Sequence, residues 1–269
     1  MDDLPQVFVI SLKSSTDRRA RIQGELEALG FAFRFVDGID LRDTDIRNHP
    51  DYDGARRRMY FGRDLEPGEL GCLLSHREVY RRIVDEEIPC ALVLEDDARL
   101  EADLPQVLIS IINSKIEWDM IRFLDKKKVY RKKCRHIGML DAKHELARLP
   151  TNSGGAYGYL LTRRAAARLL DLMEKNWLQN DVLHSRSWQT GLTAYIVRPS
   201  PVTHPNDDDT TIGTKRYDKA VRLSGLRRLL HPVMRFAMKN QDQMMKRMNY
   251  LAAIPLDGRN RKVLSSSRD

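Results

Sequence analysis

Residues 91–97 read ALVLEDD, an apolar run that ends in three adjacent acids. A run of this length, with Pro89 before it and charge after it, predicts a buried strand. Because successive side chains of a strand point to opposite faces, Glu95 and Asp97 should share one face and Asp96 the other. Clustered carboxylates repel one another, so a hard cation such as Mg²⁺ or Mn²⁺ would stabilise them. On these residues alone, a solvated acidic turn is the simpler explanation.

The segment before this strand predicts a helix. Pro67 and Gly68 mark a turn, and apolar residues then recur at helical spacing as far as Asp85. Ser75 and His76 fall inside this helix. A core hydroxyl and a core imidazole are more common there than catalytic groups.

The N-terminal part has the pattern of an α/β protein. Residues 6–12 predict a strand, residues 17–29 a helix, and residues 31–36 a second strand. A strand, a helix and a strand in this order predict a parallel sheet of the nucleotide-binding type.

Elements further along the chain follow from the same patterns. Residues 40–64 are charged, rich in turn residues and poorly periodic, so we expect a long functional loop there. We expect a helix at residues 104–112, a strand at 118–124, a helix at 162–175 and a strand at 193–197.

Length and composition bound the class of protein. With 269 residues, the chain is long enough for one large domain or for a domain with an appendage. No apolar stretch approaches the roughly 20 residues that span a bilayer. The first residues lack the basic and apolar regions of a signal peptide, so we expect a cytoplasmic protein. Three cysteines without metal-ligand spacing (Cys72, Cys90 and Cys134) agree with a reducing compartment and predict no zinc site.

Positive charge is concentrated at the C-terminal end. Residues 215–269 carry a net charge of +10 and residues 1–214 carry −2, out of a total of +8. We expect residues 1–214 to form the main domain and residues 215–255 a basic helical appendage. Pro232 interrupts the amphipathic pattern of this appendage, which predicts two short helices. We expect residues 256–269 to be a disordered tail.

Several motifs together resemble glycosyltransferase family 25, the bacterial lipooligosaccharide galactosyltransferases that are related to collagen galactosyltransferases. They span roughly residues 6–205 in the order and spacing of that family. The motifs are VFVISL (7–12), DRR (17–19), FVDGID (35–40), GELGC (68–72), SH (75–76), LVLEDD (92–97), GGAYGY (154–159) and RAA (164–166).

The resemblance implies a GT-A-like fold, in which a mostly parallel central sheet binds a nucleotide sugar, and transfer with inversion. It implies a UDP-sugar donor, UDP-galactose being the commonest in the family, and UDP-glucose remains the alternative. It also implies a glycolipid acceptor, the glycan of a lipooligosaccharide or lipopolysaccharide, at the inner face of the inner membrane. The basic C-terminal segment would then adsorb to this anionic membrane surface as a peripheral anchor.

The resemblance also implies which residues bind the donor. Ile10, Ser11 and Leu12 would line the base and ribose, with Arg18 near the diphosphate and Asp37 near a ribose hydroxyl. Asp37 could equally form an Asx-turn, and the glycines could mark close approach of backbone segments. Further donor contacts are expected at Gly71, Ser75, His76, Asp96, Gly154, Gly155 and Ala156, with Asn152 and Ser153 beside the last group.

A divalent metal is expected at the acidic strand. Asp97 is the first choice as its ligand, with Glu95 or Asp96 beside it, and the resemblance adds His204 from the far end of the domain. Mn²⁺ or Mg²⁺ there would neutralise the charge that develops on the departing nucleoside diphosphate.

The general base that accepts the proton of the attacking hydroxyl should be a carboxylate. Asp181 matches a family position, and it could equally be the N-cap of a helix. The acids at residues 207–209 are competitors that the sequence does not separate from it.

Two other classes of protein fit parts of the sequence. A basic nucleic-acid-binding module would use the run at residues 126–135 and the C-terminal segment. The net charge of −2 on residues 1–214 and the lack of an aromatic-interleaved recognition motif argue against it, so we expect no nucleic-acid partner. A metal-dependent phosphohydrolase could use the same acids. A family member without activity is a third possibility, against which the intact Glu95, Asp96 and Asp97 argue.

Overall fold

The computed structural model of the protein describes residues 4–125, 133–150, 154–204 and 225–266. The expectations for Asn152, Ser153 and residues 207–209, and for most of the basic run at 126–135, lie outside this part of the chain.

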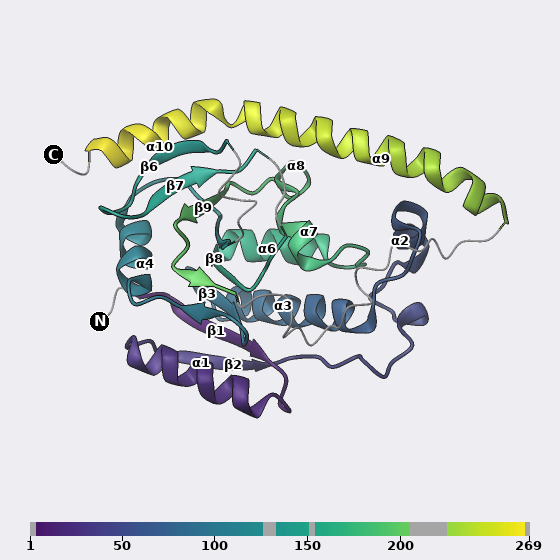
Figure 1. The fold of residues 1–269 in the computed structure, drawn as a ribbon, viewed down its shortest axis with the longest axis horizontal. Helices are drawn as coiled ribbons and strands as arrows, with labels where there is room; N and C mark the ends of the chain where they lie inside the picture. Colours follow the sequence, from purple (N-terminus) through teal and green to yellow (C-terminus); the bar gives the residue numbers. More distant parts are fainter. Residues whose placement is uncertain (1–3, 126–132, 151–153, 205–224, 267–269) are drawn as a thin grey trace.

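The centre of the fold is an eight-stranded sheet in the order β2-β1-β3-β8-β5-β9-β7-β6 (Figure 1). Within the described residues, β7 and β8 run opposite to the other six strands, so the sheet is mixed and six of its strands share one direction. The strands are β1 (Gln6–Ser11), β2 (Phe33–Asp37), β3 (Cys90–Glu95), β5 (Met120–Phe123), β6 (Arg135–Met139), β7 (Glu145–Arg148), β8 (Gly158–Thr162) and β9 (Ala194–Arg198).

Helices cover both faces of this sheet and produce two cores. The alternation of β3 divides its side chains, because Leu92 and Leu94 pack with α1 and α4 while Ala91 and Val93 pack with α3 and α6. The α/β class and the helix predicted to run to Asp85 are confirmed, and the helix begins at Pro67, within the predicted turn. The covering helices are α1 (Thr16–Ala28), α3 (Pro67–Asp85), α4 (Leu104–Asn113) and α6 (Arg163–Leu172).

Short elements complete the described part of the chain. A two-stranded antiparallel sheet joins two segments that are about a hundred residues apart in sequence. The short elements are η1 (Ile46–Asn48), α2 (Gly54–Phe61), β4 (Arg99–Leu100), α7 (Asn180–His184), α8 (Ser187–Thr190) and β10 (Val202–Thr203).

The prediction of a loop at residues 40–64 is wrong for residues 54–61, which form α2 and pack against the protein. Arg57 is only 1% exposed, and its guanidinium lies 3.9 Å from the ring centroid of Phe61. Arg56 lies over the ring of Trp177 in the same way, at 4.3 Å. Burial lowers the pKa of Arg57 to about 10. The charge of these residues suggested a solvated loop, whereas their flat guanidinium groups stack on aromatic rings.

The segment around Pro232 also differs from its prediction. One helix, α9 (Gly225–Ala252), runs through the proline and along one side of the protein (Figure 1). Proline removes one helical hydrogen bond, which other interactions must offset. Packing supplies them here, since the adjacent His231 is buried and α9 contacts α2 and α8.

Residues 256–266 are helical, so the prediction of a disordered tail is wrong for them. They belong to α10 (Ile254–Ser266), which packs against β6. Asp257 and Asn260 are at most 2% exposed, and Asp257 accepts hydrogen bonds of 2.8–2.9 Å from Arg148. The polar composition of this segment predicted disorder. The prediction failed because Arg148, the ion-pair partner of Asp257, lies more than a hundred residues away in sequence and cannot be recognised from the segment alone.

Candidate functional site

A cleft lies where β1 and β3 end, at the carboxyl edge of three parallel strands. Ligands of open α/β sheets commonly bind at this edge. The cleft contains about 630 Å³ of space, part of it open to solvent. Eight of the residues predicted from the sequence line it: Ile10, Ser11, Leu12, Arg18, Ser75, Glu95, Asp96 and Asp97.

Asp96 is held by the neighbouring strand and helix. The parallel register of β1 and β3 pairs Ile10 with Glu95, which brings Ser11 next to Asp96. The hydroxyl of Ser11 donates a hydrogen bond of 2.6 Å to Asp96 Oδ2, and Arg18 Nη1 lies 3.4 Å from Asp96 Oδ1. Both carboxylate oxygens of Asp96 therefore have partners, so its side chain is held in place where it lines the cleft.

Asp97 and His204 meet through the small sheet. The antiparallel pairing of β10 with β4 places Thr203 opposite Arg99, and His204 Nε2 then lies 3.0 Å from Asp97 Oδ2. Asp97 Oδ1 is buried, and no group in the described part of the chain donates a hydrogen bond to it. A buried carboxylate oxygen without a partner is costly, and a divalent cation would satisfy it. The unpartnered oxygen of Asp97 thus fits Mn²⁺ or Mg²⁺, whereas His204 Nε2 could hold the same cation only without a proton, in place of its contact with Asp97.

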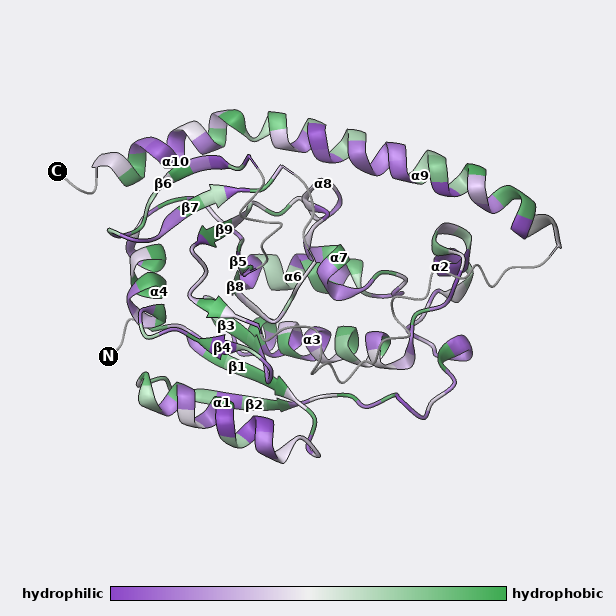
Figure 2. Cartoon of the chain, viewed as in Figure 1, coloured by the Kyte–Doolittle hydropathy of each residue, from purple (hydrophilic) through white to green (hydrophobic). Residues whose placement is uncertain are grey.

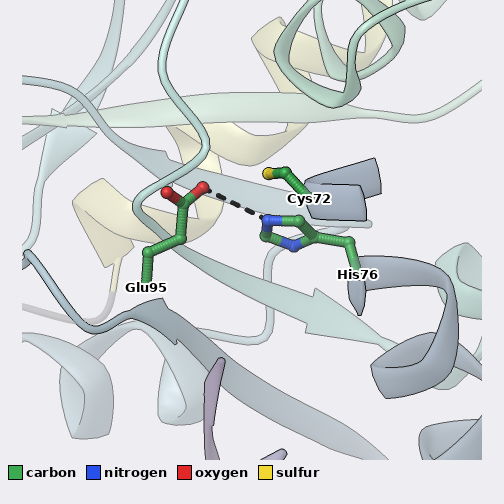
Figure 3. Close-up of side chains that lie close together, drawn as sticks. All are labelled: Cys72, His76 and Glu95. Atoms are coloured by element: carbon green, nitrogen blue, oxygen red, sulfur yellow. Dashed lines mark hydrogen bonds and ion pairs between the residues drawn. The ribbon is translucent and has the colours of Figure 1, made fainter. Parts of the chain in front are cut away.

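Glu95 faces a different partner from the other two acids (Figure 3). Its Oε1 lies 3.2 Å from Nε2 of His76, and ligand atoms of Cys72, His76 and Glu95 all lie within 4.8 Å of one another. Among the described residues, this is the group that brings three metal-ligating side chains together, whereas Asp97 and His204 form a separate pair. Burial, followed by nearby carboxylates, raises the pKa of the Cys72 thiol well above its usual value.

The small-residue segment before β8 connects the acids to Asp181. The N–H of Glu95 donates to the carbonyl of Tyr157 at 2.9 Å, so this segment runs beside the acidic strand. Two residues earlier, the N–H of Gly155 lies 3.3 Å from Asp181 Oδ2, and Arg122 Nη2 donates to the Gly155 carbonyl at 2.9 Å. Burial lowers the pKa of Arg122 to about 10, with the Asp181 carboxylate opposing the shift. The predicted base therefore lies near the predicted donor segment.

The sequence profile of glycosyltransferase family 25, described as an LPS biosynthesis protein, matches residues 4–184. The chain belongs to glycosyltransferase family 25. The match contains the cleft acids, the small-residue segment and Asp181, while His204 lies beyond it.

The relatives of this family 25 chain include proteins named as galactosyltransferases and one that is named as inactive. Procollagen galactosyltransferase 1-B of Xenopus laevis is 29% identical over 184 residues, covering 62% of this chain and 28% of the relative. Inactive glycosyltransferase 25 family member 3 of Homo sapiens is 36% identical over 132 residues, covering 46% and 22%. Procollagen galactosyltransferase 2 of Homo sapiens is 30% identical over 128 residues, covering 43% and 20%. The chain spans less than a third of the length of each.

Among solved structures, the inositol-1-phosphate CTP transferase from T. maritima is similar to this family 25 chain with a TM-score of 0.38 and 11% identity, over 72% of this chain and 85% of that one. The likeness is too low to carry an argument.

Other predicted donor residues of this family 25 chain have structural roles at the rim. Asp37 is half exposed and forms ion pairs with Arg19 at 2.6 Å and Lys13 at 3.3 Å. The hydrogen bond from Arg19 is the main cause that lowers the pKa of Asp37. A Cβ on Gly71 would lie 2.3 Å from the Ile39 carbonyl oxygen, so only glycine permits this approach.

Two further predictions concern the helices of this family 25 chain. Ser75 donates to the Gly71 carbonyl and accepts the N–H of Ile39 at 2.8 Å, which ties α3 to the loop after β2. Gln179 is the N-cap of α7, so Asp181 stands in the first turn and is not the cap. Gly154 and Ala156 flank Gly155 and do not line the cleft at the end of β1 and β3.

Reading the sequence missed three buried polar residues behind Glu95. Tyr80, Tyr159 and His184 are at most 2% exposed and are hydrogen-bonded to one another and to His76. Tyr80 follows His76 by four residues, so the two side chains lie on the same face of α3. The spacing of four residues from His76 could therefore have indicated Tyr80 from the sequence. Tyr159 and His184 reach the group only through the pairing of β8 with β3 and the position of α7.

Proposed function

We propose that this chain is a metal-dependent, inverting glycosyltransferase with a GT-A-like fold. It would transfer galactose from UDP-galactose to the glycan of a lipooligosaccharide or lipopolysaccharide. The supporting observation is the cleft at the ends of β1 and β3, which is lined by Arg18, the held carboxylate of Asp96, and Asp97, whose other contact is His204. UDP-glucose is the alternative donor, since it differs from UDP-galactose in the orientation of one hydroxyl.

In this proposal the nucleoside, the diphosphate and the metal are held by different residues. Ile10, Ser11 and Leu12 contact the nucleoside, and Arg18 contacts the diphosphate. Asp97 and His204, with Glu95 beside them, would hold Mn²⁺ or Mg²⁺, which would supply Lewis-acid stabilisation of the departing diphosphate.

Asp181 is proposed to accept the proton of the attacking hydroxyl. The hydrogen bond from Gly155 to Asp181 Oδ2 orients this carboxylate beside the small-residue segment. A single displacement with inversion needs a base of this kind and no covalent intermediate. The proposed reaction thus uses Asp181 on the acceptor side and the acids of β3 on the donor side.

Calorimetry of the whole chain with UDP-galactose, UDP-glucose and UDP-N-acetylglucosamine tests the donor. We expect UDP-galactose to bind in the presence of Mn²⁺ and to bind at least about tenfold more weakly after chelation, because the diphosphate charge would then be less neutralised. The absence of binding to all three donors by folded, metal-supplemented protein would contradict the proposal. Preferential binding of UDP-glucose would retain the transferase and change the sugar.

The C-terminal helix α9 supports a proposed association with the inner face of the inner membrane. Its inward side carries the buried His231 and the partly buried Asp242 and Lys246, while the exposed part of the helix mixes apolar side chains with charged and polar ones. Figure 2 shows apolar residues recurring along its length. Seven apolar side chains are more than half exposed: Leu229, Leu230, Val233, Phe236, Met244, Met248 and Leu251.

Exposed apolar side chains interspersed with arginines and lysines are typical of a helix that lies in a membrane interface. Arg228, Arg235, Lys239 and Arg247 are exposed along the same helix, which matches the charge of anionic lipid. Among the described residues, no helix combines the length and apolar character needed to cross a membrane. We propose that α9 adsorbs to the cytoplasmic surface and brings the cleft close to a glycolipid acceptor.

Co-sedimentation with anionic vesicles tests this association. The double substitution Val233→Asp and Phe236→Asp should weaken binding about tenfold or more, because each buried apolar side chain is worth about 1.5–3 kcal/mol. Met59→Asp, at an exposed apolar residue of α2, is the matched control and should bind like the unmodified chain. Equal sedimentation of the double variant and the control would contradict the proposal.

A further inference from the structure

We propose that His184, Tyr80, Tyr159 and His76 form a hydrogen-bond chain with one fixed direction, which ends by donating the Nε2–H of His76 to Glu95. His76 would then be a positioning residue that holds the carboxylate of Glu95. The importance of this position for sugar transfer rests on the proposed function. The chain itself rests only on contacts between described residues.

The links of this chain are short and continuous. Glu95 Oε1 lies 3.2 Å from His76 Nε2, and His76 Nδ1 lies 2.7 Å from the hydroxyl of Tyr159. The hydroxyls of Tyr159 and Tyr80 are 2.9 Å apart, and the hydroxyl of Tyr80 lies 2.7 Å from His184 Nε2. The two tyrosines and His76 are fully buried, and His184 is 2% exposed. Buried polar groups of this kind are costly unless they are paired, so the chain must satisfy its own donors and acceptors.

The contact between His76 and Glu95 indicates the direction. A carboxylate oxygen 3.2 Å from Nε2 fits an N–H donated by that atom, and an imidazole ring with a single proton then accepts at Nδ1. Tyr159 must then donate to Nδ1 and accept from Tyr80, because each hydroxyl has one proton. The other acceptor near the Tyr80 hydroxyl, Asn180 Oδ1, is farther away at 3.4 Å, against 2.9 Å for Tyr159. Tyr80 in turn accepts the Nε2–H of His184.

The far end of the chain supports the same direction. His184 Nδ1 is buried, and no group within the described part of the chain pairs with it. In the proposed direction this atom is a lone pair, whereas the opposite direction would make it an N–H. Orphaned buried N–H groups are rarer than unpaired acceptors. Burial lowers the pKa of His184 well below its usual value, which keeps the ring neutral with a single proton.

A soft cation at Cys72, His76 and Glu95 is the rival explanation for the group in Figure 3. Such an ion would need the lone pair of His76 Nε2, and therefore a proton on Nδ1. The two explanations predict opposite tautomers of one residue. The direct contact of 3.2 Å between His76 Nε2 and Glu95 Oε1 favours the hydrogen bond.

Nitrogen-15 NMR of the histidine-labelled whole chain distinguishes the tautomers. We expect both His76 and His184 to carry their proton on Nε2, with His76→Gln and His184→Gln used only to assign the signals. A proton on Nδ1 of His76, or an imidazolium, in otherwise metal-free protein would overturn the inference. A second measurement adds Zn²⁺ to protein in which His76 Nε2 carries the proton. If the proton then moves to Nδ1, the ion reverses the direction of the hydrogen bonds, and the direction inferred for the metal-free protein is supported.

A functional readout follows from removing one link. Tyr159→Phe removes the proton donated to His76 Nδ1, and outer partners of metal sites are worth about 10–100-fold in affinity. We expect the signal of the unprotonated His76 Nδ1 to shift as it loses its hydrogen bond, and Mn²⁺-dependent donor binding to weaken about tenfold. Tyr60→Phe, on a tyrosine outside the chain, is the control and should leave both unchanged. A His76 Nδ1 signal that is unaltered in folded Tyr159→Phe would overturn the inference.

The two proposals fail separately. If the unmodified chain binds no UDP-sugar, the proposed function fails while the tautomer of His76 still decides the hydrogen-bond chain. If donor binding is found and His76 carries its proton on Nδ1, only the inferred direction fails. A variant that does not fold removes the affinity comparison, and the measurement on the unmodified chain remains decisive.

Discussion

Asp97→Asn is expected to weaken Mn²⁺-dependent donor binding by more than about 100-fold. Asp97 is paired with His204 through one oxygen, and its other oxygen is buried without a partner in the described residues. Loss of an outer partner of a metal ligand already costs about 10–100-fold, so loss of charge on a direct ligand should cost more. Calorimetry at a fixed Mn²⁺ concentration measures the change.

The control for this variant is Asp171→Asn, at an exposed acid of α6. It removes the same charge from the protein without touching the cleft, and it should bind the donor like the unmodified chain. Undiminished, metal-dependent binding by folded Asp97→Asn would show that Asp97 is not a metal ligand. A loss in both variants would point to a general effect of charge.

Asp257→Asn is expected to lower the free energy of unfolding by about 3–5 kcal/mol. Asp257 is 1% exposed and accepts hydrogen bonds from Arg148 and, at 2.9 Å, from Tyr195. Removing one member of a buried ion pair leaves the other charge buried without compensation, which is the reason for the large cost. Urea unfolding followed by circular dichroism measures the difference.

Arg259→Ala provides the comparison on the same helix. Arg259 forms an exposed ion pair with Glu117 at 3.6 Å, and pairs of this kind contribute about 0–1 kcal/mol. The two variants should therefore separate clearly. Equal, small effects of both substitutions would mean that α10 does not depend on Asp257 for its attachment to the sheet.

The local sequence pattern was sufficient to predict the elements that form the cleft at the ends of β1 and β3. The strand and helix from Gln6 to Ala28, and the helix from Pro67 followed by β3, have periodic apolar residues and clear turn signals. Each of these elements forms where its pattern predicts it. The family motifs also indicate a site at the carboxyl end of β3, where the structure brings Ser11, Asp96 and Arg18 together.

Long-range pairing explains most of what local pattern missed. Arg57 stacks on Phe61 within a short helix that has no strong apolar periodicity. The meeting of Asp97 with His204 depends on the register of β10 with β4, and the burial of Asp257 depends on Arg148. His204 was proposed from the family resemblance, because no feature of residues 200–204 alone indicates a partner a hundred residues away. The tautomer of His76 likewise depends on neighbours from three separate elements.

The central strand β9 lies outside the part of the chain that matches the family. The family match ends at residue 184, yet β9 (Ala194–Arg198) lies between β5 and β7 and joins the β6–β7 hairpin to the rest of the sheet. A fragment ending at residue 184 would also lack Asp257, the ion-pair partner of Arg148 on β7. The segment shared with relatives is therefore shorter than the segment that must fold cooperatively, and recombination at its boundary would divide a single sheet.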